Sequence, residues 1–518
     1  MATVTATVTA MAMRRNTRGF LFPLGVSLGL AALPAVAGEW TITPSISLQE
    51  TATDNVKLDR NRKSDLITDI SPGIKIDGRG GRVNLRFDYR MHNLFYANDS
   101  SRSNIQNSLN ALGTIEALEN WFFIEASGSI SQQSVSAFGG ATNSSVNTNS
   151  GSNTTETSTY RLSPYFRGTL GSFADYQLRY NLSTSSSKAG GTYDTDTREI
   201  VGRLAGLTTY ARLGWALDAS SQEVEYGNGR KSEADRLRGV LTYHYDPQFR
   251  MLLIGGREAN DYLSLDKESH TIKGVGFEWA PTERTKISAS RESRFFGDSN
   301  SISFSHRTGG TAWKYSQSKD ATSSPNQQSG VGLGTYYDLF FNMFASAIPD
   351  PNARAAYVNA LLLSSGISPA AQLQGGFLTS GVTLQQRREL SFALLGVRNT
   401  VTFAATQSES QNLSQGAGTG LLIGTDFANV QNIRQRGLSV NWSHNLTGLS
   451  TLAGGISKLK SKGSGGNELE TDQTMYTLNF LTKLGPKTSA GLGARRVVVD
   501  GSTSYTENAL TGSLSHQF

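Results

Sequence analysis

Polar and apolar residues alternate strictly along residues 82–92. Odd positions from 83 to 91 carry apolar or aromatic side chains, whereas even positions from 82 to 92 carry polar ones. Successive side chains of a β-strand point to opposite faces, so this stretch predicts a strand with one apolar and one polar face. On this pattern Phe87 belongs to the apolar face and Arg86 to the polar face.

The same period of two recurs along nearly the whole chain. Clear examples are residues 175–182, 212–218, 236–245, 438–443 and 476–480. A soluble β-sandwich could use such strands with their apolar faces turned inward, and each stretch alone is weak evidence. Together with connections that alternate between short turns and long polar loops, however, they favour an all-β fold, a transmembrane antiparallel up-and-down β-barrel.

The strand count follows from the alternating connections. We expect about 22 strands, an even number as in single-chain bacterial barrels, within a range of roughly 18 to 22. Residues 301–318 leave part of this range open, because they form either two strands with a turn at 308–310 or one long strand.

Residues 1–37 have the features of a signal peptide. A basic segment with three arginines precedes an apolar run at residues 19–33, and an Ala-Val-Ala sequence ends at Ala37. A membrane-anchoring helix is the alternative, but two prolines and the short apolar span disfavour it. We therefore expect cleavage after Ala37 and export of residues 38–518, the barrel domain, through the inner membrane to the bacterial outer membrane.

Composition agrees with an exported barrel and excludes several other classes. Only 37% of the residues are hydrophobic, which is too few for a helical membrane protein, and the absence of cysteine excludes disulfides and thiolate metal sites. Removing the three arginines of the predicted signal peptide lowers the formal charge from +6 to +3. A charge this small gives no reason to expect a nucleic-acid partner.

The two ends of the predicted barrel carry further signals. The last alternating segment, residues 508–518, ends in Phe518 and resembles the insertion signal of Gram-negative barrel proteins, although a chance ending is the alternative. The first strand begins almost immediately, at Trp40. This leaves no room for an N-terminal plug domain and disfavours TonB-type uptake.

One long connection, residues 319–379, contains a segment that does not alternate. Within residues 336–366 the apolar positions recur at helical spacing, and Asp350 followed by Pro351 is typical of a helix start. We predict a short helical hairpin in this loop, with helices of about 13 residues that are too short to span a membrane. Its candidate gate residues are Tyr336, Phe340, Phe344, Tyr357 and Leu361.

The position of this hairpin is open at this stage. It can pack on the rim of its own barrel, fold into the lumen as a constriction or gate, or pair with a partner. The loop alternation indicates only that the connection begins on the outer side of the membrane.

The polar faces of the predicted strands carry many charged residues. The candidate lumen-lining set is Arg86, Asp88, Arg90, Arg161, Arg167, Asp175, Arg179, Arg212, Asp218, Arg238 and Glu389. These side chains can neutralise one another in mutual salt bridges. They can also form a mildly basic conduit that binds anionic sugars weakly enough to let them pass.

No arrangement of residues indicates catalysis or cofactor binding. The six histidines form no H-E-x-x-H motif or other two-histidine metal spacing, and no G-x-S-x-G motif occurs. The Gly-rich stretch 416–420 lacks the Lys-Ser or Lys-Thr of a phosphate-binding loop. We therefore expect no enzyme activity, no metal and no cofactor.

Three further stretches are distinctive: SHRTGGTAW at 305–313, IPDPNARAAYVNALL at 348–362 and ELSFALLGVRNTVTF at 389–403. Together they resemble the PEP-CTERM-system-associated outer-membrane protein family of Gram-negative bacteria. The resemblance covers the whole mature chain and is most specific between about residues 300 and 405. It implies an outer-membrane β-barrel associated with exopolysaccharide loci and the exosortase sorting system, with no catalytic residues to carry over.

Three functions are compatible with these patterns. The first is a conduit or accessory protein for exopolysaccharide export or surface attachment, as the resemblance implies. The second is a general diffusion porin, and the third is a structural or adhesive anchor. Expected partners are outer-membrane lipid and, for the first function, exopolysaccharide and periplasmic export components.

Overall fold

The structure of the protein, a computed structural model, describes most of residues 38–518. The stretches left out of the description within this range are 140–145, 150–152, 190–193, 209, 211, 228, 265, 323–336, 338–339, 342–343, 345–353, 356, 360–376, 380, 414–425, 467 and 503. The predicted signal peptide, residues 1–37, also lies outside the described residues.

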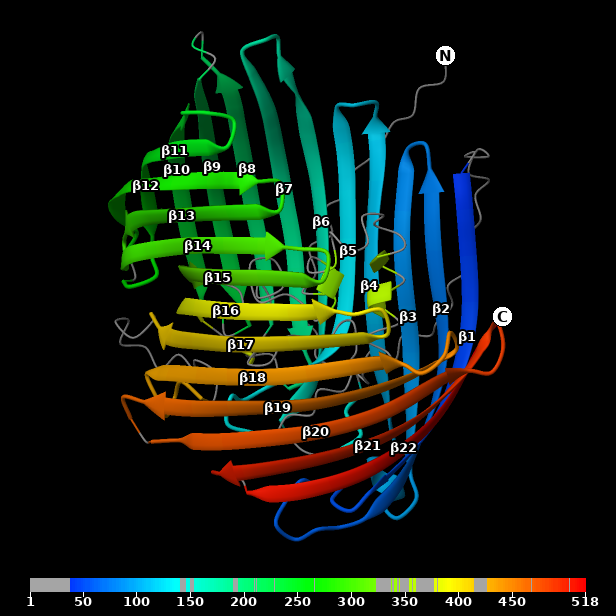
Figure 1. Ribbon diagram of the computed structural model, residues 1–518. Helices are drawn as coiled ribbons and strands as arrows, with labels where there is room; N and C mark the ends of the chain where they lie inside the picture. Colours follow the sequence, from blue (N-terminus) through cyan, green and yellow to red (C-terminus); the bar gives the residue numbers. More distant parts are fainter. Residues whose placement is uncertain are drawn as a thin grey trace, which may run out of the picture. The chain divides into compact units, whose positions relative to one another are not determined.

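Twenty-two antiparallel strands form one closed sheet. They are β1 (Gly38–Thr53), β2 (Asp65–Gly80), β3 (Val83–Tyr96), β4 (Asn104–Leu118), β5 (Phe122–Ser134), β6 (Thr154–Leu170), β7 (Ala174–Ser187), β8 (Thr195–Leu207), β9 (Leu213–Tyr226), β10 (Lys231–His244), β11 (Phe249–Asn260), β12 (Glu268–Thr282), β13 (Thr285–Arg294), β14 (Gly297–Arg307), β15 (Thr311–Thr322), β16 (Thr383–Leu395), β17 (Asn399–Asn412), β18 (Asn432–Asn445), β19 (Ser450–Ser464), β20 (Glu470–Lys483), β21 (Thr488–Gly501) and β22 (Tyr505–Gln517). Each strand pairs with its neighbours in sequence, and β22 pairs with β1 to close the ring (Figure 1). The predicted up-and-down β-barrel and its count of 22 strands are confirmed.

The connections divide the barrel into two different ends. At the end where β1 begins, which we call the turn end, the ten connections have two to five residues. At the opposite end, the loop end, connections reach 19 residues after β5 and after β17 and 60 residues after β15. Such one-sided loop lengths are typical of barrels that cross an outer membrane.

One connection decides a point that the sequence left open, and another departs from the predicted loop lengths. Residues 301–318 form parts of two strands with the turn at 308–310, so the two-strand alternative is correct. The β13–β14 connection, by contrast, has only Phe295 and Phe296, although it lies at the loop end, where long loops are predicted. This tight reversal is followed by Gly297 at φ +93°, a backbone conformation that glycine adopts without steric cost.

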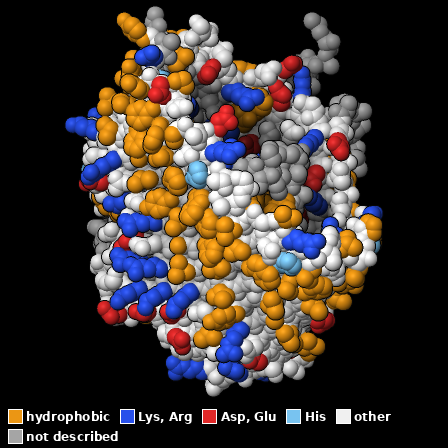
Figure 2. Space-filling view, in the orientation of Figure 1, with side chains coloured by type: hydrophobic (Ala, Val, Ile, Leu, Met, Phe, Trp, Pro, Cys, Tyr) orange, Lys and Arg blue, Asp and Glu red, His pale blue; other side chains and the backbone are white. Residues whose placement is uncertain are grey.

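Strand pairing fixes which residues share a face of the sheet. In β3, Leu94 and Tyr96 are buried against Val146 of the β5–β6 loop, so their face is the inner one. The opposite face of the sheet carries the exposed apolar side chains, such as Leu178, Leu438 and Leu478. On the face of the molecule seen in Figure 2, hydrophobic side chains gather over the outer surface of the strands. The apolar side therefore points outward, as the alternation predicts.

The described residues contain little helix. A 3₁₀ turn covers Ser100–Arg102, and helical residues occur at 337, 340–341, 354–355 and 357–359. No helix among the described residues is long and apolar enough to cross a membrane.

Candidate functional site

The inner face of the barrel carries nearly all of the predicted lumen-lining residues. By the strand register, the following face the lumen: Arg86, Asp88, Arg90, Arg161, Arg167, Asp175, Arg179, Asp218, Arg238 and Glu389. Arg212 does not lie on a strand. It lies in the turn before β9, where its carbonyl accepts a hydrogen bond from the backbone N–H of His244 at 2.7 Å. The two-residue period does not continue past a strand end, so alternation misplaced this residue.

Luminal arginines on β6 and β7 pack against aromatic rings and acids. The guanidinium of Arg179 lies 4.3 Å from the ring centroid of Tyr165 and 3.2 Å from a carboxylate oxygen of Glu125. The guanidinium of Arg167 lies 4.1 Å from the ring centroid of Phe123, and this ring stacks on Tyr165. These contacts hold the two cations against the wall of the barrel.

A second luminal network links β8, β9, β10 and β13. Arg238 donates to both carboxylate oxygens of Glu292, at 2.6 and 3.3 Å, and lies 3.8 Å from Asp218. Asp218 is also 3.6 Å from Arg203. The pattern of the sequence identifies Arg238 and Asp218 but not their partners Arg203 and Glu292, whose strands alternate less clearly. This network supports the interpretation in which luminal charges neutralise one another.

The mouth of the lumen contains a buried serine, histidine and aspartate. Nδ1 of His92 lies 2.8 Å from Asp69 and 2.9 Å from the hydroxyl of Ser71, which in turn lies 2.6 Å from Asp69. In a hydrolase, the serine and the aspartate contact opposite nitrogens of the histidine ring. Here they share one nitrogen, so the geometry is that of a structural polar cluster. Among the described residues there is also no group of three or more His, Asp or Glu that could hold a metal.

The predicted gate segment enters the lumen. Its described residues within 337–359, which we call the insert, form an apolar cluster in which Phe340, Phe344 and Val358 are buried. The barrel residues of this cluster are Ala312 and Ala393, which face the lumen. Of the three positions left open by the sequence, the described part of the insert therefore occupies the inside of the barrel. The candidate gate residues Tyr336 and Leu361 lie outside the described residues.

The insert contacts the wall far from where its loop leaves the sheet. The loop starts after Thr322 and ends before Thr383, both at the loop end, yet Ala393 lies ten residues further along β16. At about 3.3 Å per residue this corresponds to about 33 Å along the strand. The hydroxyl of Tyr357 lies 3.1 Å from that of Thr400, the second residue of β17, again close to the turn end. The described part of the insert therefore packs near the turn end, although both ends of its loop join the sheet at the loop end.

The loop end is covered by segments that meet across the barrel. We call these segments the mouth cover: described residues of 135–153, 377–382 and 426–430. One apolar cluster joins Phe138, Phe377, Phe427 and luminal Ile433. A second joins Val146 to β2 and β3, as described above for the inner face.

Two buried carboxylates tie the mouth cover together. Asp426 accepts hydrogen bonds from the hydroxyl of Ser136 and the backbone N–H of Ala137, both at 2.6 Å. Burial raises the pKa of the Asp426 carboxyl, although these two hydrogen bonds act in the opposite direction. Glu507 of β22 is fully buried and accepts from Asn149 at 2.8 Å and from Arg495 at 2.9 Å. The cover is thus fastened to opposite sides of the ring.

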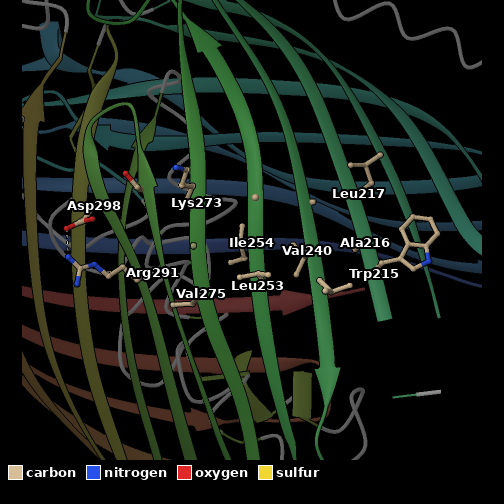
Figure 3. Close-up of a pocket in the computed structure, with 15 residues that line it drawn as sticks. Trp215, Ala216, Leu217, Val240, Leu253, Ile254, Lys273, Val275, Arg291 and Asp298 are labelled. Carbon is tan, nitrogen blue, oxygen red and sulfur yellow. Dashed lines mark hydrogen bonds and ion pairs between the residues drawn. The ribbon is translucent and has the colours of Figure 1, made fainter. Parts of the chain in front are cut away.

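A shallow apolar groove on the outer face is a separate feature. Figure 3 shows it over β9 to β14, between Leu217, Leu253 and Val275 and below Lys273. Gly255 leaves open space at its floor. Because its apolar walls belong to the outer face, this groove does not belong to the lumen.

Comparisons with known proteins support the fold alone. No family model matches the chain, and no curated protein matches its sequence. The FrpB iron transporter from Neisseria meningitidis superposes with a TM-score of 0.51 at 10% identity, covering 92% of this chain and 82% of that one. The siderophore receptor PirA from Acinetobacter baumannii gives 0.48 at 8% identity, with 92% and 80% covered. The chain has the fold of an outer-membrane β-barrel, in which the loop end faces outward and the turn end faces the periplasm.

Proposed function

We propose that the protein is an outer-membrane conduit, closed by its own insert, for a large polar polymer of the exopolysaccharide class. It reaches the outer membrane after cleavage of residues 1–37 and works with periplasmic export components. The observation that carries the proposal is the apolar cluster around Phe344, which holds the insert on the luminal wall near the turn end. A segment rooted at the loop end but packed near the turn end can close the lumen when docked and open it when released.

The size and polarity of the lumen support passage of a polar polymer. Barrels of 16 or more strands leave a lumen that is either aqueous or plugged. The wall carries paired charges and arginines that contact aromatic rings. These side chains can form hydrogen bonds with a sugar polymer while binding it weakly. Conduction requires this kind of weak binding at many positions.

The mouth cover favours a second function, that of a structural or adhesive anchor. Its segments are fastened across the ring by Asp426 and Glu507, as a permanent lid would be. A barrel with a permanent lid would attach surface material without transporting it. A general diffusion porin is less well supported, because the insert and the mouth cover both occupy the lumen of the described structure.

Conductance in planar lipid bilayers separates these functions. The purified protein is compared with a variant in which residues 337–359 are replaced by a short Gly-Ser linker. A conduit closed by the insert predicts little conductance in the intact protein and a large increase in the variant. Absence of conductance in both forms supports the anchor, and high conductance in the intact protein supports the porin.

Deletion of the gene in the native bacterium tests the substrate class. Surface and secreted polysaccharide should fall if the conduit exports exopolysaccharide, and complementation with the intact gene should restore it. Normal polysaccharide secretion in the deletion strain contradicts the export function even if the barrel conducts ions.

A further inference from the structure

Six cations gather on the outer face of β16, β18 and β19, in their half nearer the loop end. The strand register places all of them outward, and we call them the basic patch: Arg388, Arg434, Arg436, Lys458, Lys460 and Lys462. All six are exposed. In Figure 2 Lys and Arg side chains form rows over this part of the sheet, beside the hydrophobic surface.

The register places like charges directly opposite each other. Arg434 pairs with Lys462 across β18 and β19, and Arg436 pairs with Lys460 in the next outward row. Like charges at directly opposite positions destabilise a sheet. Arg388 lies in the same row as Arg436, with Gln407 of β17 between them. The arrangement is therefore costly for the barrel alone and would be stabilised by a bound anion.

Neighbouring acids neutralise only half of the basic patch. Glu409 lies 2.8 Å from Arg434, Asp472 lies 3.1 Å from Lys458, and Glu470 lies 2.5 Å from Lys460. Among the remaining cations, Arg388 and Arg436 make no ion pair with any described acid, and Lys462 lies opposite Glu470, whose carboxylate already pairs with Lys460. The patch thus carries an excess of three positive charges on an outward surface.

The basic patch begins where the apolar outer band ends. On β16 Arg388 follows Leu390 toward the loop end, and on β18 Arg436 follows Leu438, which is 61% exposed. Cations on the lipid face of a barrel cost about 2–4 kcal/mol at the membrane midplane but almost nothing at the interface. The patch therefore lies at headgroup level, and the loop end places it in the outer leaflet.

We propose that the basic patch binds the phosphorylated headgroup of an outer-leaflet lipid, whose acyl chains lie on the apolar band below. Clusters of four to eight Lys and Arg beside a membrane typically recognise anionic lipid headgroups. The direct step from Leu438 to Arg436 matches the step from acyl chain to phosphate within one lipid. The groove of Figure 3 is a weaker site for such a headgroup, because Arg291 at its side is already paired with Asp298 at 2.5 Å.

Native mass spectrometry of the purified full-length barrel tests this proposal. Lipid A carrying its two phosphates is added as the probe and compared with its dephosphorylated form and with phosphatidylcholine. The patch variant combines Arg388→Gln, Arg436→Gln and Lys462→Gln. At about fivefold per charge, removing three charges should weaken binding of phosphorylated lipid A roughly 100-fold at low salt.

A control variant removes three cations outside the basic patch that are already paired with acids. It combines Lys231→Gln, Lys267→Gln and Arg291→Gln, whose acid partners lie within 3.1 Å. This variant should bind phosphorylated lipid A as the unaltered protein does. An equal loss in both variants, or equal binding of dephosphorylated lipid A to the unaltered protein, overturns the proposal.

Three further measurements complete the test. Inorganic phosphate should compete only weakly with lipid A, since it lacks acyl chains, and strong competition would indicate an ion site and contradict lipid binding. Loss of lipid on Lys273→Gln alone would move the site to the groove of Figure 3 and also overturn the proposal. If the patch variant does not fold, a salt titration of the unaltered barrel decides, because screening should release the lipid.

Discussion

The lumen is occupied at both ends, but the two occupied regions are held in different ways. At the loop end, the mouth cover combines separate apolar clusters with buried carboxylates and reaches strands on opposite sides of the ring. Near the turn end, the described part of the insert packs on β15 and β16 through the apolar cluster around Phe344, and the hydroxyl of Tyr357 contacts Thr400 of β17.

On the proposed conduit function, this difference identifies the insert as the closure that opens at the lower free-energy cost. Opening the mouth cover requires several separate interactions to break together, whereas the described contacts of the insert with the wall centre on one cluster around Phe344. A closure that is held at one place can respond to a partner or a polymer with a modest free-energy change. The predictions below are designed to break or to sharpen this comparison.

The largest effect is expected at the insert. Phe344→Ala removes a fully buried ring from the single cluster and should weaken docking by about 3–5 kcal/mol, so that the insert spends most of its time released. Conductance in planar bilayers should rise severalfold. Phe403→Ala is the matched control, because this ring is 41% exposed on the outer face of β17, and its conductance should not change. Unchanged conductance in Phe344→Ala would contradict closure of the lumen through this cluster.

Removing the buried carboxylate of β22 should destabilise the mouth. Glu507→Ala leaves the Arg495 cation without its partner and removes the acceptor for Asn149. The free energy of unfolding should fall by about 3 kcal/mol. This is at the lower end for a broken buried ion pair, because the Arg495 side chain is still 19% exposed. The unfolding temperature of the barrel should fall. Glu507→Gln, which keeps a hydrogen-bond acceptor but removes the charge, should lose less. An equal loss in both variants would attribute the whole effect to the charge of Glu507, and no loss in either variant would contradict the tie.

A smaller effect is expected when the tie at Asp426 is removed. Asp426→Ala leaves the hydroxyl of Ser136 and the N–H of Ala137 without their acceptor, at a cost of about 1–3 kcal/mol. Amide hydrogen exchange at Ala137 should become faster. Conductance should stay low, because the insert remains docked through the cluster around Phe344. A large conductance increase in Asp426→Ala would contradict closure by the insert and identify the mouth cover as the closing element.

The hydroxyl of Tyr357 should contribute still less. Tyr357→Phe removes its contact with Thr400 but keeps the ring that packs on Phe344, so docking should weaken by about 1 kcal/mol. Open events in single-channel recordings should become a few times more frequent. Thr400→Val should have the same effect, and the double variant should add little, because both changes remove one contact.

The smallest expected effect is a pH dependence of the mouth cover, because only the protonation of the Asp426 carboxyl changes and no side chain is removed. The pKa of Asp426 is raised by burial, so the closed mouth binds this proton more tightly than the opened or unfolded chain does. Closure should therefore be strongest in mild acid and weaken as the pH rises through the raised pKa. Protection of the Ala137 amide against hydrogen exchange, corrected for intrinsic exchange, should fall over the same pH range. In Asp426→Asn this pH dependence should be absent.

The sequence predicts the barrel well because its information is local. Alternation along a strand determines which side chain faces lipid, so Phe87 and Arg86 could be assigned to faces without knowledge of other strands. The same rule fails at Arg212, one residue outside β9, because the period ends where the ladder ends. The short β13–β14 connection was missed for a related reason, since loop length at one end of a barrel is a tendency and not a geometric requirement.

The contents of the lumen could be predicted only in part. Helical spacing identified Phe340, Phe344 and Tyr357 as one apolar surface, but nothing local indicates which wall that surface meets. The ties of the mouth cover join residues that are 290 positions apart, for Ser136 and Asp426, and 358 positions apart, for Asn149 and Glu507. Pairings of this kind depend on the closed ring and leave no pattern in a single sequence.

The contact between β1 and β22 also bears on how the molecule is assembled. Nine residue pairs hold this seam, against sixteen between β1 and β2, and its hydroxyl contact between Thr51 and Thr511 joins positions 460 residues apart. Such a distant pairing carries the largest loop-closure entropy of any ladder in the sheet until the hairpins between its strands have formed. The β1–β22 ladder is therefore the last to form during folding. Until it forms, β1 and β22 each have an unpaired edge that an insertion machinery can bind.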